Sequence, residues 1–97
     1  MKTLIVAAAL LAALPAAAQD TQGRNLAAGC AICHGTEGRP VTKDMATLAG
    51  LPREHISTQM RAFRDGKRPA TVMHHIAKGY SDQQIDALAA WFAAQKR

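Results

Sequence analysis

The chain has 97 residues, of which 12 are Lys or Arg and 7 are Asp or Glu, and its formal net charge is +5. A chain of this length forms one small domain with a modest hydrophobic core, and such domains often depend on a staple or a bound group. The basic excess fits an acidic protein partner or an anionic surface. It does not indicate a nucleic-acid binder, because aromatic residues are few and no basic run is long.

The first twenty residues, MKTLIVAAALLAALPAAAQD, have the pattern of a secretory signal peptide. Lys2 provides the positive start, and Ala16 to Ala18 provide the small residues that precede a cleavage site. The apolar run between them has about twelve residues, which is shorter than the ~20 that span a bilayer. We therefore expect a signal peptide over residues 1–18, one domain over residues 19–97, export to the periplasm, and no stable insertion in a membrane.

The first expected element of the exported part is a short helix from about Gly23 to Ile32. In this helix Leu26, Ala27 and Ile32 would face a core. The following stretch, GTEGRPVTKDMATLAGLP, contains three glycines and two prolines. This density of helix-breaking residues predicts an irregular loop.

A second helix is expected in REHISTQMRAFRDG, because Ile56, Met60 and Phe63 fall on one helical face. Pro52 suits the first turn of this helix and Gly66 suits its end. The next segment, GKRPATVMHHIAKGY, predicts either a single helical turn or an extended loop.

The last helix has the clearest signals. Ser81 and Gln84 form the sequence pattern of a capping box, and Ile85, Leu88 and Phe92 then repeat at helical spacing. No stretch alternates in the manner of a β-strand. The pattern predicts an all-α domain of three to four helices, whose few large apolar residues leave its middle to be filled by something else.

The pentapeptide CAICH, residues 30–34, carries the chemistry. A structural zinc site normally needs four protein ligands, and a redox dithiol normally lies between a strand and a helix, which this sequence does not predict. A plain disulfide between cysteines so close in sequence would be strained. For zinc, CAICH offers three candidate ligands, and the other histidines, His55, His74 and His75, are scattered along the chain.

C-x-x-C-H is the signature of c-type haem attachment. Two intervening residues let the sulfurs of Cys30 and Cys33 form thioethers at one edge of the porphyrin, and His34 is then carried beneath the ring to bind the iron. Attachment outside the cytoplasm agrees with the signal peptide, and a large flat apolar group would supply the missing core. The sequence therefore predicts one covalently attached haem c with its iron.

The iron in such a site usually has a second axial ligand, which must come from a segment that can reach the opposite face of the ring. We expect Met73 in this role, because it lies far along the chain and just before the last helix. Met60 is expected to be a core residue, Met45 lies too soon after the motif, and His74 and His75 are expected to face solvent. The full set of candidates is Met45, Met60, Met73, His55, His74 and His75.

The segments CAICHG, LAGLP and AFRDGKRPATVMHHIAKGYSDQQIDALAAWFAAQK resemble the class I cytochromes c. The likeness is closest to a small bacterial group that includes the haem subunit of flavocytochrome c sulfide dehydrogenases and the halves of certain dihaem cytochromes. It covers the chain from about Asn25 to Lys96. The resemblance implies a small class I cytochrome c fold wrapped around one covalently bound haem.

Carried over to this chain, the resemblance implies thioethers at Cys30 and Cys33 and iron bound by His34 and Met73. Two further roles follow from the same likeness. Pro40 resembles the proline whose carbonyl accepts the other N–H of the ligand histidine. Trp91 would pack the last helix against the first helix near Leu26.

The expected function is electron transfer without catalysis, with electrons accepted from a flavoprotein such as a sulfide dehydrogenase. The alternatives are a free shuttle to an oxidase and, less favoured, a gas-binding or sensory haem protein or a peroxidase. A positive rim around the second helix and the loop to Met73 would steer an acidic partner, unless these cations form an ordinary solvated face. The cations are Arg53, Arg61, Arg64, Lys67, Arg68 and Lys78.

Overall fold

The computed structural model describes residues 21–97, and the expected signal peptide over residues 1–18 lies outside this part. Residues 21–27 are helical and continue into a 3₁₀ helix, η1 (Ala28–Cys30), and a short α-helix, α2 (Ala31–His34). Three more helices follow, and the whole described part contains no β-strand. They are α3 (Arg53–Arg64), α4 (Met73–Ala77) and α5 (Asp82–Ala93). The all-α expectation is therefore confirmed.

The ends of the two long helices follow the signals in the sequence. Ser81 caps α5 by accepting a hydrogen bond from the backbone N–H of Gln84, and the Gln84 side chain accepts one from the Ser81 N–H in return. Pro52 immediately precedes α3, and Gly66 follows its end with a φ of 74°. The segment predicted as either a helical turn or a loop contains the five-residue helix α4.

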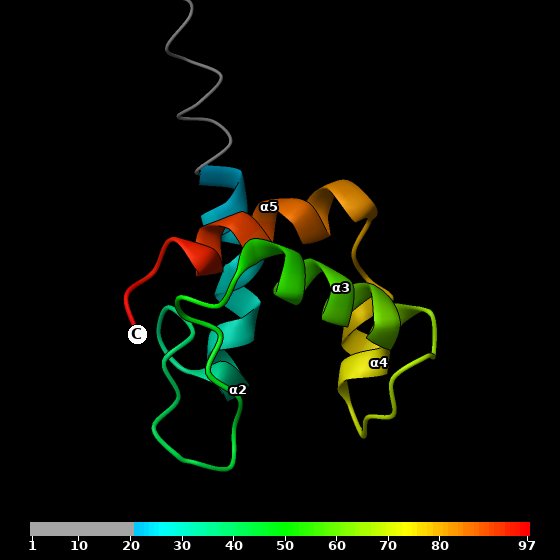
Figure 1. Ribbon diagram of the computed structural model, residues 1–97, viewed down its shortest axis with the longest axis horizontal. Coiled ribbons are helices and arrows are strands. Elements are labelled where there is room, and N and C mark those ends of the chain that lie inside the picture. Colours follow the sequence, from blue (N-terminus) through cyan, green and yellow to red (C-terminus); the bar gives the residue numbers. More distant parts are fainter. Residues whose placement is uncertain (1–20) are drawn as a thin grey trace, which may run out of the picture.

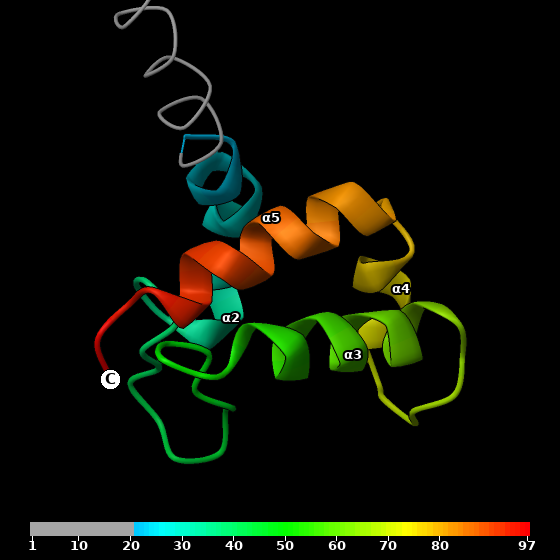
Figure 2. The same cartoon turned by 45° about the horizontal axis from the view of Figure 1, so that its top comes forward.

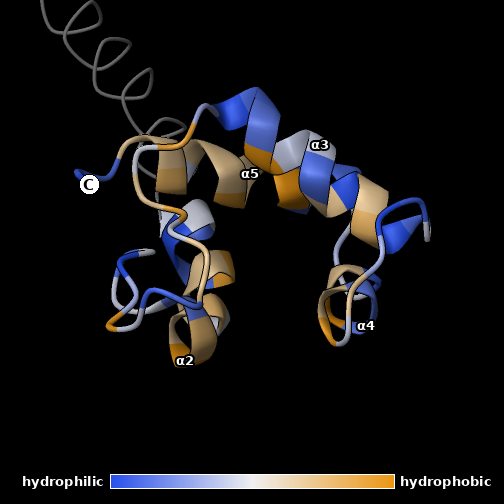
Figure 3. Cartoon of the chain, turned by 60° about the horizontal axis from the view of Figure 1, so that its bottom comes forward, coloured by the Kyte–Doolittle hydropathy of each residue, from blue (hydrophilic) through white to orange (hydrophobic). Residues whose placement is uncertain are grey.

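The two long helices form a layer, and two short segments project from it, which we call the α2 arm (η1 and α2) and the α4 arm. α3 and α5 run side by side, and the helical stretch of residues 21–34 crosses α5 near its C-terminal half (Figures 1 and 2). α2 and α4 lie at opposite ends of the α3–α5 pair and on the same side of it (Figure 3). None of the helices described in residues 21–97 is long and apolar enough to cross a membrane.

The core is built mainly from α5 and the facing side of α3. Phe92, Ile85 and Leu88 are the largest fully buried side chains, and Ile56 and Met60 contribute from α3. The remaining buried apolar residues in the described part are alanines. Met60 is thus a core residue, as expected.

Ile32 does not face this core, contrary to the prediction from helical spacing. Its side chain is 90% exposed, whereas Ala27 in the same helical stretch is 3% exposed. Residues 28–30 form a 3₁₀ helix, which has three residues per turn instead of 3.6. Because each residue of this tighter helix rotates further about the helix axis, the residues beyond Cys30 no longer follow the α-helical spacing of the first two turns, and Ile32 points to solvent.

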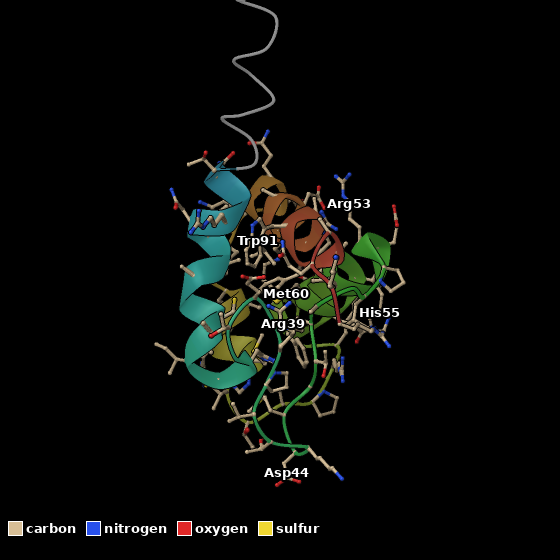
Figure 4. The ribbon with its side chains drawn as sticks, turned by 90° about the vertical axis from the view of Figure 1, so that its left-hand side faces the viewer. Arg39, Asp44, Arg53, His55, Met60 and Trp91 are labelled. Atoms are coloured by element: carbon tan, nitrogen blue, oxygen red, sulfur yellow. The ribbon has the colours of Figure 1, made fainter. Side chains whose placement is uncertain are left out.

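A glycine allows the first helical stretch to approach α5. A Cβ on Gly23 would lie 2.7 Å from the carbonyl oxygen of Ala87 and 3.2 Å from the Cβ of Trp91. Trp91 and Leu26 are half-buried and pack against the core cluster, and Trp91 lies between the two helices (Figure 4). The expected packing of the last helix on the first helix through Trp91 is therefore present, and Gly23 sets its distance.

Ion pairs hold α3 against α5 on the other flank. Arg61 donates to Asp82 at 3.2 Å and to Asp86 at 2.9 Å, and Arg64 donates to Asp82 at 2.7 Å. The buried hydroxyl of Ser57 also donates to Asp86. Hydrogen bonds from the two arginines lower the pKa of Asp82 below its ordinary value.

Gly23→Ala is predicted to destabilise the protein by roughly 1–3 kcal/mol, because the added methyl group would force the two helices apart. Gly29→Ala is the matched control, since a Cβ at Gly29 would meet nothing within 4 Å. It should leave stability unchanged or raise it by up to about 1 kcal/mol. Denaturant unfolding of the three proteins tests this pair, and equal losses in both variants would contradict the crossing described above.

The Asp82 ion pairs are predicted to stabilise the fold above pH 4 and to lose this contribution in acid. The pKa of Asp82 is lowered by folding from its ordinary value of 3.8, so the stabilisation is fully present above 3.8 and disappears as pH falls through the lower folded value. The melting temperature of Asp82→Asn should lie below that of the wild type at pH 6 and converge with it near pH 2. Asp44→Asn is the control, since the exposed Asp44 carboxylate makes no ion pair within residues 21–97. A gap between wild type and Asp82→Asn that does not change with pH would contradict the assignment.

Candidate functional site

The pentapeptide CAICH forms the arm at one end of the α3–α5 pair. Cys30 ends η1, and Cys33 and His34 lie in α2, so a single helical stretch carries all three side chains. Cys30 is half-buried against the core cluster, and Cys33 is exposed. Neither cysteine forms a disulfide.

The geometry of His34 defines which ring nitrogen is free. Its Nδ1 lies 2.8 Å from the carbonyl oxygen of Ala46. A carbonyl can only accept a hydrogen bond, so Nδ1 carries the proton and donates it. Nε2 of the neutral ring then retains its lone pair, which is the state in which imidazole binds a metal ion.

The acceptor for His34 differs from the one expected from the family resemblance. Pro40 was predicted to supply this carbonyl, and the structure assigns the hydrogen bond to Ala46 instead. Ala46 follows Pro40 by six positions in the same loop. The prediction of a backbone acceptor in this loop is correct, and the prediction of its residue is wrong.

The loop that carries Ala46 is anchored on both sides by backbone hydrogen bonds. The N–H groups of Leu48 and Ala49 both donate to the carbonyl of Gly38, at 2.9 and 3.1 Å. The N–H of Gly50 donates to the carbonyl of Phe92 in the last turn of α5. These bonds connect the segment that orients His34 to the core of the domain.

Burial raises the pKa of the Cys30 thiol, and the negative charge of a Cys33 thiolate raises it further. Tyr80 is close enough for the Cys30 charge to raise the pKa of its phenol as well, in addition to the larger effect of burial. The Tyr80 hydroxyl donates to the carbonyl of Leu26 at 3.4 Å. Tyr80 therefore connects the start of α5 to the helical stretch that carries the cysteines.

Met73 opens α4, the arm at the other end of the α3–α5 pair. It is half-buried and packs against the same core cluster as Cys30. Met45 is adjacent to Ala46, so it belongs to the loop that holds His34 and not to the opposite arm. His55 is exposed at the start of α3. Of the candidates for a distal ligand outside the core, only those on α4 lie on the arm opposite His34.

The two histidines that follow Met73 have different surroundings. His75 is exposed, as expected. His74 is half-buried, and its Nδ1 is buried without a hydrogen-bond partner, so the expectation that His74 faces solvent is wrong. The two rings lie 3.9 Å apart between centroids with an interplanar angle of 42°.

The residues on the two arms fit a haem c. The cysteines are unpaired, Nε2 of His34 is free for a metal, and a buried polar atom of His74 lacks a partner next to Met73. The described residues gather no group of three or more His, Cys, Asp or Glu side chains that would suit a protein-bound metal ion. Large apolar side chains on both arms are exposed. They are Ile32 on α2, Val72 before α4 and Ile76 within it.

Only some cations of the expected positive rim are available to contact a partner, because the others form contacts within the domain. Arg61 and Arg64 are committed to ion pairs with Asp82, Asp86 and Asp65, which was not predicted from the sequence. Arg68 donates to Gln59 and lies over the ring of Phe63 at 4.7 Å. The rim cations whose charged groups make neither an ion pair nor a hydrogen bond within residues 21–97 are Arg53, Lys67 and Lys78.

Comparison with known proteins agrees with this arrangement. The family model for cytochrome c matches residues 21–96. Cytochrome c4 of Pseudomonas aeruginosa is 33% identical over 97% of this chain, and the cytochrome subunit of sulfide dehydrogenase of Chlorobaculum tepidum is 37% identical over 75% of it. Cytochrome c-553 of Helicobacter pylori is 32% identical over 99% of it.

These relatives differ in length. The alignments span 47% of the cytochrome c4 and 66% of the sulfide dehydrogenase subunit, but the whole of the cytochrome c-553. The resemblance to small bacterial cytochromes c is thereby confirmed. The all-α fold is consistent with a class I cytochrome c.

Proposed function

The chain belongs to the cytochrome c family, whose members bind haem c covalently and carry electrons, and we propose that it is a periplasmic single-haem carrier that accepts electrons from a flavoprotein of the sulfide dehydrogenase type. The haem supplies a one-electron Fe(III)/Fe(II) couple when bound. We further propose that Cys30 and Cys33 form the two thioethers, and that His34 and Met73 are the axial ligands.

The observation that carries this proposal is the hydrogen bond from His34 to Ala46. It holds the neutral ring in the tautomer that leaves Nε2 free, directly after the two cysteines. Met73 complements it from the opposite arm with a thioether sulfur, which favours the reduced iron. With His34 and Met73 both bound, the iron would have no open position for a substrate, which fits transfer of electrons and not catalysis.

Two relatives support a dehydrogenase as the electron donor. One is named the cytochrome subunit of sulfide dehydrogenase, and another, from Stutzerimonas stutzeri, is named the thiosulfate dehydrogenase electron acceptor. The alternative within the same class is a free shuttle to an oxidase. Stable co-purification with a flavoprotein is expected for the first role and not for the second.

The surface of α4 is suited to an acidic partner. Lys67 in the preceding loop and Lys78 directly after α4 are exposed cations that make no ion pair within residues 21–97. Between them in the sequence are Val72 and Ile76, whose apolar side chains are 54% and 40% exposed. Exposed apolar side chains and unpaired cations on the same short segment favour a redox protein with acidic residues around its own contact area.

Met73→Ala is predicted to remove the weak near-infrared band that methionine-ligated ferric haem shows in the wild type. The thioethers and His34 should retain the haem, so the visible bands should persist. Met60→Leu serves as the control, because Met60 is 7% exposed in the core and should not affect the band. Haem binding without the band in the wild type would contradict ligation by Met73 and favour a histidine ligand or a gas-binding site.

Lys78→Glu is predicted to slow reduction by the flavoprotein subunit of sulfide dehydrogenase roughly threefold to tenfold at low salt, because it reverses a charge at the proposed contact. The difference from wild type should shrink as ionic strength rises. Arg24→Glu makes the same charge change at an exposed position in the first helical stretch and should have a smaller effect. A wild-type rate that does not depend on ionic strength, or equal effects of both variants, would contradict docking on α4.

A further inference from the structure

Arg39 lies outside the candidate ligand set, yet it connects two distant parts of the chain beside the CAICH arm. We propose that Arg39 is a positioning residue for the haem, because its guanidinium anchors the loop whose Ala46 carbonyl holds His34. Through this loop it sets the strength of the hydrogen bond from His34 and thereby the reduction potential. This inference rests on the proposed role of His34 as an axial ligand.

The contacts of Arg39 reach across the sequence. Its Nη1 donates to the carbonyl oxygen of Lys96 at 2.8 Å, and its Nη2 donates to the carboxylate of Glu37 at 3.0 Å. Its backbone N–H donates to the carbonyl of Thr36 at 3.0 Å, which closes a tight turn after α2. Arg39 lies next to the C-terminal segment in Figure 4. The side chain therefore fixes the start of the loop against the residues that follow α5.

Two glycines in this turn, Gly35 and Gly38, allow close contacts that a larger residue would prevent. A Cβ on Gly35 would collide with the Arg39 carbonyl, and a Cβ on Gly38 would lie 2.8 Å from the Ala49 nitrogen and 2.9 Å from the Phe92 ring. Both glycines have a φ of 81°, which other residues rarely adopt. The turn is thus held in one place by close backbone contacts.

Backbone hydrogen bonds connect this turn to the segment that contains Ala46. Gly38, the residue before Arg39, accepts hydrogen bonds from the N–H groups of Leu48 and Ala49. Ala46 precedes Leu48 by two residues, so a movement of the Gly38 carbonyl displaces the Ala46 carbonyl with it. The path from the Arg39 side chain to Nδ1 of His34 consists of this short backbone segment and two sets of hydrogen bonds.

Replacing Arg39 is expected to change the position of the Ala46 loop more than it changes the free energy of unfolding. The side chains of Arg39 and Glu37 are 41% and 44% exposed, and ion pairs with this exposure contribute little to folding. The hydrogen bond from a ligand histidine, in contrast, raises the basicity of the ring and so stabilises the oxidised iron. Weakening that bond is expected to raise the reduction potential.

The direction of the change separates this role from a simple effect of charge. Loss of the positive charge of Arg39 would by itself favour the more positive, oxidised centre and lower the potential. Loss of the anchor would weaken the hydrogen bond from His34 and raise the potential. The two explanations therefore predict opposite signs.

The experiment is a redox titration of the haem-loaded Arg39→Gln protein, combined with proton NMR of the His34 Nδ1–H in the reduced state. We expect a higher potential than in the wild type and faster exchange of this proton with solvent. Lys43→Gln is the matched control, because Lys43 is exposed in the same loop and makes no ion pair within residues 21–97. It should leave the exchange rate unchanged and should not raise the potential.

Arg39→Lys retains the charge but loses the forked geometry, and it should show a smaller rise; it also tests the proposal if Arg39→Gln does not fold. A lower or unchanged potential in both Arg39 variants would overturn the inference. The hyperfine-shifted ring protons of His34 in the oxidised wild type report ligation independently. Their absence would refute the proposed function, whereas their presence with unchanged potentials would refute only the role of Arg39.

Discussion

The hydrogen bond from His34 to the Ala46 carbonyl is the interaction on which the chemistry of this domain depends. It selects the tautomer of the ring and orients it, but the carbonyl belongs to a loop without regular structure. The loop is held in place because the Gly38 carbonyl accepts hydrogen bonds from the N–H groups of Leu48 and Ala49, and the Gly50 N–H donates to the Phe92 carbonyl in the last turn of α5. The orientation of a candidate iron ligand is therefore derived from the packing of the C-terminal helix, more than fifty residues further along the chain.

The positive side chains of this domain have two different roles: the arginines of α3 stabilise the fold, and the lysines on either side of α4 in the sequence are proposed to steer a partner. Arg61 and Arg64 face Asp82 and Asp86 across the α3–α5 contact, so their charges are neutralised within the domain. Lys67 precedes α4 in the chain and Lys78 follows it directly, and neither makes an ion pair within the described residues. A long-range field toward a partner can come only from charges that are not neutralised locally, so the lysines are better suited to steering than the arginines.

Much of the fold was predictable because its signals are local. A capping box, a proline before α3, a glycine after it and apolar residues at helical spacing are short patterns with direct physical causes, and the helices begin and end where these signals lie. The CAICH motif was equally informative, since its spacing is imposed by the chemistry of one porphyrin edge. These features need no knowledge of what lies across the fold.

The features that were missed depend on geometry that the sequence does not record. Every residue has a carbonyl, so the residue type could not distinguish Ala46 from Pro40 as the acceptor for His34. Ile32 was misplaced because a 3₁₀ turn advances each residue by about 20° more than an α-helix does. His74 and His75 differ because neighbours on a helix point about 100° apart, so one faces the protein when the other faces solvent.

The two arms that carry the proposed ligands are connected through the protein framework, and this has a consequence for electron transfer. α4 has five residues, too few for a stable isolated helix, and it depends on the fully buried Ala77 and on the chain that leads to Tyr80. Tyr80 is in turn hydrogen-bonded to Leu26, in the helical stretch that carries the cysteines. The separation of His34 and Met73 is therefore determined by this contact and by the α3–α5 pair. Ligands held by the protein framework in this way change little in geometry when the charge of the iron changes, and a small change in geometry is what rapid one-electron exchange requires.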